Sequence, residues 1–456
     1  MQREQLSSRM GFLLLSAGCA IGVGNVWKFP WLTGQNGGGI FVLAYLVFLI
    51  LLGLPVMTME FAVGRASQKS PVCMYQKIEP AGSKWHWHGY AALAGNVILM
   101  MFYSVVSGWM LYYLVSSANG SLASLDPQSI GGFFGELLTD APKITFYTLI
   151  TVIGAFIILA FPLRNGLEKV SKWMMGSLFI LMLFLAIHSL LLDGAAKGLS
   201  FYLLPDFSKV TSNTIVAAMN QAFFSLSIGI GSMAIFASYI NKEQSLVKES
   251  INVICLDTIV AILAGLIIFP ACFTYGVKPS AGPSLIFEAL PNIFNEMAYG
   301  RVWGTFFFLF MTFATFSTVL AVCEAILSCV RDLTHWSRPN ASLVCGTAVA
   351  ILSLPCALGF SVLSDFQPLG PGTAVLDLED FIVSNLLLPL GSFCFVLFCT
   401  RKCGWGWKNY LAEVNTGKGL KMPTIMRFYC TWILPLIILA VFTIGIIPYL
   451  KLSFGS

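Results

Sequence analysis

Long apolar stretches separated by short polar segments run the length of the chain. Each is a candidate membrane span, because a helix needs about 20 residues to cross the hydrocarbon core of a bilayer. Eleven such stretches lie near residues 11–33, 40–64, 89–117, 144–161, 170–191, 213–240, 250–277, 302–330, 341–361, 379–400 and 428–449. The pattern predicts an all-α polytopic membrane protein that forms a single transmembrane domain over residues 1–456.

Two of these stretches carry a pair of glycines near their middle. Gly22 and Gly24 lie in the first stretch, and Gly229 and Gly231 lie in the sixth. A glycine weakens a helix interior by about 1 kcal/mol, and a backbone group freed in hydrocarbon costs several kcal/mol unless protein or water satisfies it. Interrupted helices at corresponding places in two halves are typical of a secondary transporter's binding site. Close helix packing through small residues is the alternative explanation.

The composition excludes an ordinary soluble domain, since only 10% of the residues are charged and 57% are hydrophobic. Most of the 26 Lys and Arg residues, such as those in 65–84 and 401–427, face the cytoplasm if the N-terminus is inside and the C-terminus outside. This bias accounts for the net charge of +5 without a nucleic-acid partner. The twelve cysteines predict no disulfide framework, and the four histidines are too scattered for a metal site. No nucleophile–base constellation or phosphate loop indicates an enzyme.

The residues around the two breaks belong to longer motifs. These are Gly22-Val23-Gly24-Asn25, Phe29-Pro30, Asn36-Gly37-Gly38-Gly39, Glu60 to Arg65, and Gln221 to Ser227. They resemble the neurotransmitter:sodium symporter family, and the chain is identified as a leucine-transporter-like bacterial member of its eleven-helix subgroup. The resemblance implies two inverted five-helix repeats, residues 9–191 and 213–400, with helices 1 and 6 broken and an extra helix at 428–449. It also implies the prokaryotic cytoplasmic (inner) membrane.

The resemblance further implies sodium-coupled uptake of a neutral hydrophobic or aromatic amino acid by alternating access. The substrate carboxylate is expected at Tyr103, under Phe224 as an aromatic lid. Monoamine-carrying relatives have an Asp at the position of Gly22, so this substrate should bring its own carboxylate. The implied pocket comprises Ala20, Val23, Gly24, Leu99, Tyr103, Phe224, Ser225, Ser227, Ile230, Thr318 and Val322.

Two sodium ions are expected, since hard cations prefer oxygen ligands. No organic cofactor is expected. By resemblance, site one uses Ala20, Asn25, Ser225 and Asp257, and site two uses Gly18, Ile21, Ala314, Ser317 and Thr318. An acid within the membrane is costly and indicates a functional site. The family usually has Asn where this chain has Asp257. Chloride-binding relatives have residues that match Tyr45, Gln221, Ser225 and Asp257. A fixed carboxylate would supply the charge of chloride, so transport is expected to be chloride-independent.

By the same resemblance Lys28 and Asp380 form an outer gate, and Arg3 and Asp332 an inner one. One alternative is a proton-coupled amino-acid permease of the same fold, in which Asp257 or Glu60 titrates. Uptake with and without sodium at fixed pH separates the two. A receptor or channel is the other alternative, although a receptor would more naturally carry an additional signalling domain. The lipid bilayer is an expected partner, and no obligate protein partner is evident.

Overall fold

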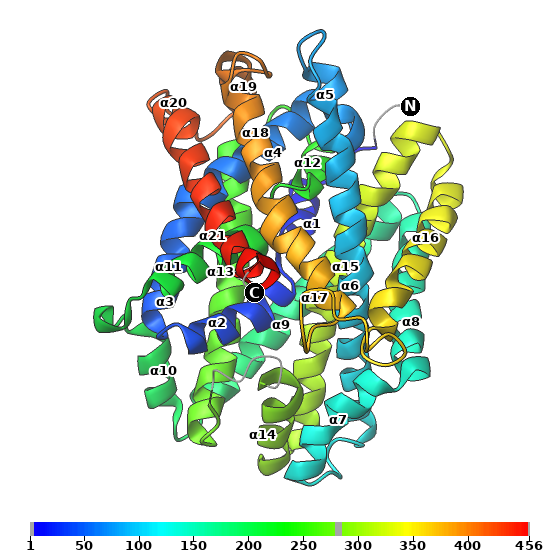
Figure 1. Ribbon diagram of the computed structural model, residues 1–456, viewed down its shortest axis with the longest axis vertical. Coiled ribbons are helices and arrows are strands. Elements are labelled where there is room, and N and C mark those ends of the chain that lie inside the picture. The colour runs from blue at the N-terminus through cyan, green and yellow to red at the C-terminus, as the bar shows by residue number, and fades with distance from the viewer. Residues whose placement is uncertain (1–3, 279–284, 455–456) are drawn as a thin grey trace.

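The computed structural model describes residues 4–278 and 285–454, and its regular structure is helical (Figure 1). In this part of the chain nine helices are long and apolar enough to cross a membrane, and a bent pair makes a tenth. The nine are Gly39–Ser67 (α3, η2, α4), His86–Asn119 (α6), Ala141–Ala160 (α8), Arg164–Leu190 (η3, α9), Leu246–Thr274 (α13), Gly300–Thr334 (α15), Arg338–Leu358 (α16), Val375–Thr400 (α17, η6, α18) and Met426–Ile447 (α20, η7 and part of α21). The predicted all-α polytopic fold is confirmed.

Both predicted breaks are present. The first span consists of α1 (Arg9–Ala20), then a π-helical turn η1 (Gly24–Lys28) and α2 (Phe29–Gln35), and its halves are bent by 55°. The sixth consists of α11 (Ser212–Ser225) and α12 (Ser232–Ala237), with residues 226–231 outside the helices. These two helices have 14 and 6 residues, so neither alone reaches the roughly 20 residues that a crossing requires.

Proline produces most of the wide π-helical turns. A proline lacks the N–H that a helix needs, and its ring crowds the carbonyl four residues earlier. A π-helical turn holds an extra residue and moves that carbonyl away. Five such turns end directly before an X-Pro pair: Gly24–Lys28 before Pro30, Leu49–Gly53 before Pro55, Leu285–Ala289 before Pro291, Ile382–Leu387 before Pro389, and Tyr429–Ile433 before Pro435.

Central and peripheral helices differ in burial. In the most apolar 18-residue stretch of α15, 72% of the residues are buried. In the corresponding stretch of α6, 67% are buried. The corresponding share is 39% for α8 and α16 and 28% for the last span, which therefore present most of their surface to the bilayer. The first half of the broken first span, α1, packs against α9, α12, α13 and α15, so both breaks lie among the other helices. Short helices α5 (Pro71–Ile78), α7 (Pro127–Thr139), α10 (Ala195–Leu203), α14 (Leu290–Glu296) and α19 (Trp407–Val414) join the spans.

Candidate functional site

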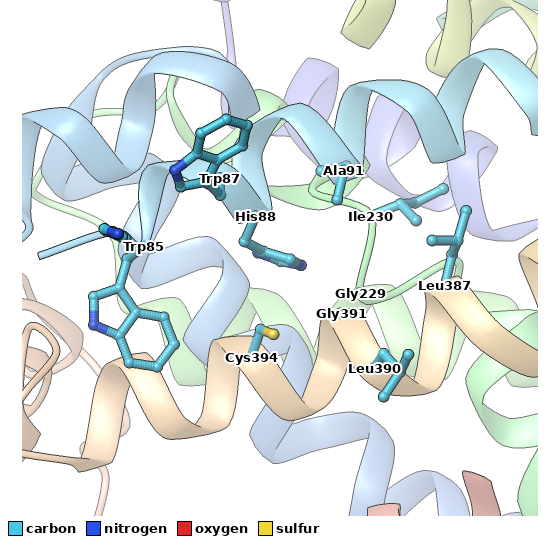
Figure 2. A pocket seen from close by; sticks show the side chains of 12 residues that line it. Trp85, Trp87, His88, Ala91, Gly229, Ile230, Leu387, Leu390, Gly391 and Cys394 are labelled. Carbon is cyan, nitrogen blue, oxygen red and sulfur yellow. The ribbon is translucent and has the colours of Figure 1, made fainter.

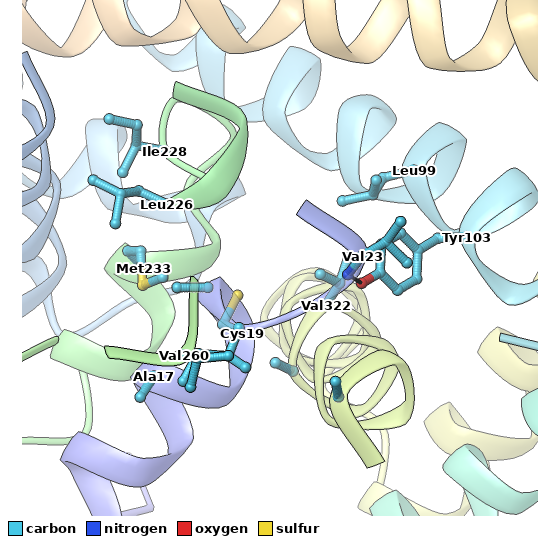
Figure 3. Packing of buried hydrophobic residues seen from close by; sticks show 14 of the residues in the cluster. Ala17, Cys19, Val23, Leu99, Tyr103, Leu226, Ile228, Met233, Val260 and Val322 are labelled. Atoms are coloured by element: carbon cyan, nitrogen blue, oxygen red, sulfur yellow. Dashed lines mark hydrogen bonds between the residues drawn. The ribbon is translucent and has the colours of Figure 1, made fainter. Parts of the chain in front are cut away.

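Gly22 lets the first break approach two polar side chains. A Cβ at this position would lie 2.1 Å from the Tyr103 hydroxyl and 2.6 Å from the Thr318 hydroxyl. The next residue, Val23, donates its backbone N–H to the Tyr103 oxygen at 2.9 Å (Figure 3). Tyr103 therefore satisfies a backbone group that the break has freed, as a site inside a membrane requires.

The second break is held by an acid on another span. Ser227, Gly229 and Gly231 have φ angles of 49°, 106° and 75°, in the left-handed region that a helix cannot continue through. Glu60 of α4 is fully buried and accepts the backbone N–H groups of Gly229 at 3.0 Å and Met233 at 3.2 Å. Its carboxylate thus caps the start of α12, where the helix dipole favours negative charge.

A polar cluster surrounds Asp257, in the middle of α13. Its carboxylate accepts hydrogen bonds from Asn25 Nδ2 at 2.8 Å, Ser225 Oγ at 2.7 Å and Tyr45 Oη at 3.3 Å. Tyr45 also donates to Ser225 at 2.9 Å. The acid is fully buried and has three donors from three other helices. Three of the four residues predicted for sodium site one, Asn25, Ser225 and Asp257, are therefore in contact.

A second group of oxygens lies where α15 crosses the first break. Thr318 Oγ1 lies 3.2 Å from the Gly18 carbonyl oxygen and 3.1 Å from that of Ile21. Ser317 Oγ lies 3.2 Å from the Gly18 oxygen and 2.9 Å from the Ala314 oxygen. All five groups predicted for sodium site two thus converge, and these neutral oxygens suit a hard monovalent cation.

A small internal cavity of about 20 Å³ lies between the two breaks. It is lined by Ala20, Gly22, Gly24, Leu99, Tyr103, Phe224, Ser227, Thr318, Val383 and Leu388. Seven of the eleven residues predicted for the substrate pocket are in this set: Ala20, Gly24, Leu99, Tyr103, Phe224, Ser227 and Thr318. Val383, in the π-helical part of the tenth span, and Leu388, the first residue of α18, were not predicted. The Leu388-Pro389 pair was the available signal, since it marks a widened turn.

The other four predicted pocket residues lie elsewhere. Ser225 bonds to Asp257, and Val23 and Val322 lie in the apolar packing beside Tyr103 (Figure 3). Ile230 faces a separate groove between α6 and α18, because its carbonyl is held by Asn96 Nδ2 at 2.8 Å (Figure 2). Direct contact of these four residues with a substrate stays a prediction.

Phe224 separates the small cavity from a larger one. It lines both, and the larger one, of about 870 Å³, also includes Lys28, Trp31 and Asp380. Lys28 Nζ lies 3.9 Å from the Phe224 ring centroid and 3.9 Å from an Asp380 carboxylate oxygen. An aromatic ring and an ion pair thus stand between the inner cavity and the outer one.

At the opposite end an acid missed by the sequence analysis joins several spans. Arg3 of the predicted inner gate lies outside the described residues, and Asp332 accepts the backbone N–H of Ser70 at 2.7 Å. Glu4 instead pairs with Arg331 at 2.7 Å and Arg338 at 3.4 Å, and it accepts the Leu163 N–H at 3.0 Å. The signal available was an acid next to Arg3 in the N-terminal segment.

Replacing Glu4 with glutamine is expected to loosen the packing of the N-terminal segment. Burial disfavours the charged form of Glu4, but Arg338 and Arg331 together hold its pKa below the usual value. Its ion pairs are therefore complete at neutral pH and weaken as the pH falls through that lowered pKa. At pH 7, hydrogen–deuterium exchange in α1 should quicken about fivefold, as expected for the loss of about 1 kcal/mol. Glu136→Gln on the exposed face of α7 is the control, and equal exchange in the two variants would contradict this role.

Comparison with known proteins places this geometry in a family. The family model described as the sodium:neurotransmitter symporter family matches residues 3–126 and 135–456. The chain belongs to this family. The symporter is 34% identical over 453 residues to an uncharacterised sodium-dependent transporter, YhdH, of Bacillus subtilis, with 98% of each chain covered. It is 33% identical to an uncharacterised sodium-dependent transporter of Haemophilus influenzae, covering 97% of this chain and 98% of the relative.

A solved structure gives the same result for the fold. The crystal structure of MhsT in complex with L-phenylalanine matches the symporter with a TM-score of 0.88 and 36% identity, over 97% of this chain and 100% of that one. The predicted family and leucine-transporter-like fold are therefore confirmed. The protein is a sodium-dependent, multi-pass membrane symporter, and its relatives are transporters and not enzymes.

Proposed function

We propose that this symporter couples the entry of sodium to the uptake of a neutral amino acid with a large apolar side chain, without a need for chloride. The observation that carries the proposal is the close approach of the Tyr103 and Thr318 hydroxyls to Gly22, which leaves no room for a side chain there. An acidic side chain at Gly22 would clash with both hydroxyls, so the cavity has no anionic partner there for a substrate amine. Among the described residues, the cavity lining is apolar or hydroxyl-bearing.

The substrate carboxylate belongs at the first break. The helix dipole of the half-helix that starts at Gly24 places partial positive charge there, and the Tyr103 hydroxyl lines the same cavity. Leu99, Val383 and Leu388 supply an apolar wall for the side chain, with Phe224 as the lid. The crystal structure of MhsT, which is 36% identical, is a complex with L-phenylalanine, which supports an amino acid of this kind.

Two sodium ions fit the two oxygen groups. At site one, Asn25, Ser225 and Asp257 would be joined by the Ala20 carbonyl and the substrate carboxylate, so the ion and the substrate would stabilise each other. At site two, the ion would replace the hydrogen bonds that Ser317 and Thr318 make to α1. It would thereby hold the first helix against α15, which couples ion binding to closure. The fixed charge of Asp257 takes the role of chloride.

Alternating access then requires closure at each end in turn. We assign the outer closure to Phe224, Lys28 and Asp380, and the inner closure to the N-terminal segment with Arg3, Glu4 and Asp332. The Lys and Arg bias supports a cytoplasmic N-terminus and an outer C-terminus. The similarity to bacterial sodium-dependent transporters supports the prokaryotic inner membrane. Family membership favours sodium coupling over the proton-coupled alternative, and Glu60 is already engaged by backbone N–H groups.

Competition for uptake into proteoliposomes tests the substrate class. With an inward sodium gradient, leucine, phenylalanine, tyrosine or tryptophan should inhibit labelled-phenylalanine uptake far better than glycine, glutamate or lysine. The ranking within the apolar group should be shallow, because one methylene changes binding by only about 1–3 kcal/mol. Competition led by glycine or by a charged amino acid would refute the proposal, as would equal uptake when choline replaces sodium at fixed pH.

A further inference from the structure

A second groove, outside the site described above, runs between the start of α6 and α18. Its volume is about 560 Å³. Figure 2 shows it with apolar side chains at one end and aromatic residues at the other. Its wall includes Gly229 and Ile230, in the break of the sixth span. The other residues that line this groove are Lys84, Trp85, Trp87, His88, Ala91, Ala92, Leu387, Leu390, Gly391 and Cys394.

The groove opens on the outer surface of the helix bundle. Trp87 and Leu390 on its rim are 66% and 37% exposed. The helices α6 and α18 are in contact and lie side by side on one outer face of the molecule (Figure 1). Exposed apolar surface on membrane-spanning helices contacts lipid, and a tryptophan at the end of a span is typical of the headgroup level. The groove is therefore accessible from the bilayer, with Trp87 near its interface.

The end of the groove at the headgroup level carries proton donors. Lys84 is exposed, and His88 lies one turn further along. The buried Tyr75 hydroxyl lies 2.6 Å from His88 Nδ1 and needs an acceptor for its proton, so Nδ1 accepts and Nε2 carries the ring proton. A Cβ on Gly391 would lie 3.1 Å from Nε2, so this edge of the His88 ring lies against α18 at the wall of the groove that His88 lines, and Nε2 makes no hydrogen bond to another described residue.

We propose that this groove binds an anionic phospholipid of the surrounding bilayer. Lys84 and the His88 N–H would hold the phosphate, as a cation and a hydrogen-bond donor near a membrane surface do. The acyl chain would lie along Ala91, Leu387 and Leu390. The combination of an apolar groove with donors at one end matches a phospholipid better than a detergent tail or a soluble apolar molecule, neither of which brings an anion.

An occupied groove would contact the break of the sixth span directly. A Cβ on Gly391 would lie 2.0 Å from the Gly229 carbonyl oxygen, so α18 already packs on this backbone, and the Gly229 N–H is held by Glu60. A lipid chain beside Ile230 would keep these contacts closed and change the rate at which the break rearranges. This coupling rests on the proposed transport function, whereas the binding itself does not.

Native mass spectrometry of the purified full-length protein tests the binding independently of uptake. The protein should retain phosphatidylglycerol about fivefold more than phosphatidylcholine. Ala91→Trp fills the groove and should lose this retention. Ala94→Trp places the same side chain on an exposed position of α6 that does not line the groove, and it should retain the lipid. Equal retention by the wild type and Ala91→Trp would overturn the proposal.

A second pair of variants tests the role of charge. Lys84→Gln should remove the preference for phosphatidylglycerol, whereas Lys77→Gln, at an exposed position of α5 outside the groove, should leave it unchanged. A preference that persists in Lys84→Gln would refute the assigned phosphate contact. Equal retention of phosphatidylcholine, or of detergent, by the wild type would show an apolar crevice without lipid specificity and would overturn the proposal as well.

Discussion

Thr318→Val should raise the sodium concentration needed for half-maximal uptake by roughly 10- to 100-fold. Valine keeps the shape of threonine but removes the hydroxyl that lies 3.2 Å from the Gly18 oxygen and 3.1 Å from the Ile21 oxygen. A hydrogen-bonding or ligand contact to a charged group contributes about 1.5–3 kcal/mol, which corresponds to this range. The measurement is the initial rate of uptake as a function of sodium concentration at saturating substrate.

Two further variants separate an ion ligand from a packing residue. Thr318→Ser keeps the hydroxyl and should restore most of the sodium affinity. Thr312→Val removes a hydroxyl of α15 that donates to the Phe308 carbonyl of its own helix at 2.7 Å, and it should leave sodium dependence unchanged. Sodium dependence of Thr318→Val equal to that of the wild type would remove site two from the mechanism.

Asp257→Asn should lower sodium-coupled uptake at least about tenfold and make the remainder respond to chloride. The substitution keeps the shape of the side chain but removes the negative charge of the carboxylate, which accepts hydrogen bonds from Asn25, Ser225 and Tyr45. Breaking a buried charged pair costs about 3–5 kcal/mol, because the remaining charge is left without compensation. A sodium ion at site one would be that remaining charge. Chloride bound near Tyr45 and Ser225 could replace part of the lost negative charge.

The comparison of chloride with gluconate buffer provides the decisive measurement. Wild-type uptake should be the same in both, and uptake by Asp257→Asn should be greater in chloride. Asp365→Asn, at an exposed loop carboxylate, serves as the control and should match the wild type in both buffers. Loss of wild-type activity in gluconate would show that the carboxylate does not take the place of chloride.

The sequence by itself determined where the chain spans the membrane and where two spans break. Both are local properties of the sequence. An apolar run of about 20 residues and a pair of glycines within it can be recognised without knowing which distant residues they contact. Ala314, Ser317 and Thr318 are likewise close in sequence, and their spacing on one helix already places their oxygens on the same side. Resemblance at the breaks then indicated the family.

Only the tertiary structure decided which distant groups meet. Glu60 caps a break 169 residues away, Glu4 pairs with an arginine 327 residues away, and Val383 and Leu388 complete the cavity from the tenth span. Ile230, which matches a pocket position by resemblance, lines the groove between α6 and α18, and Asn96 donates a hydrogen bond to its carbonyl there. Such pairings depend on the packing of whole helices, and hydrophobic periodicity records only which face of a helix is apolar, not what that face meets.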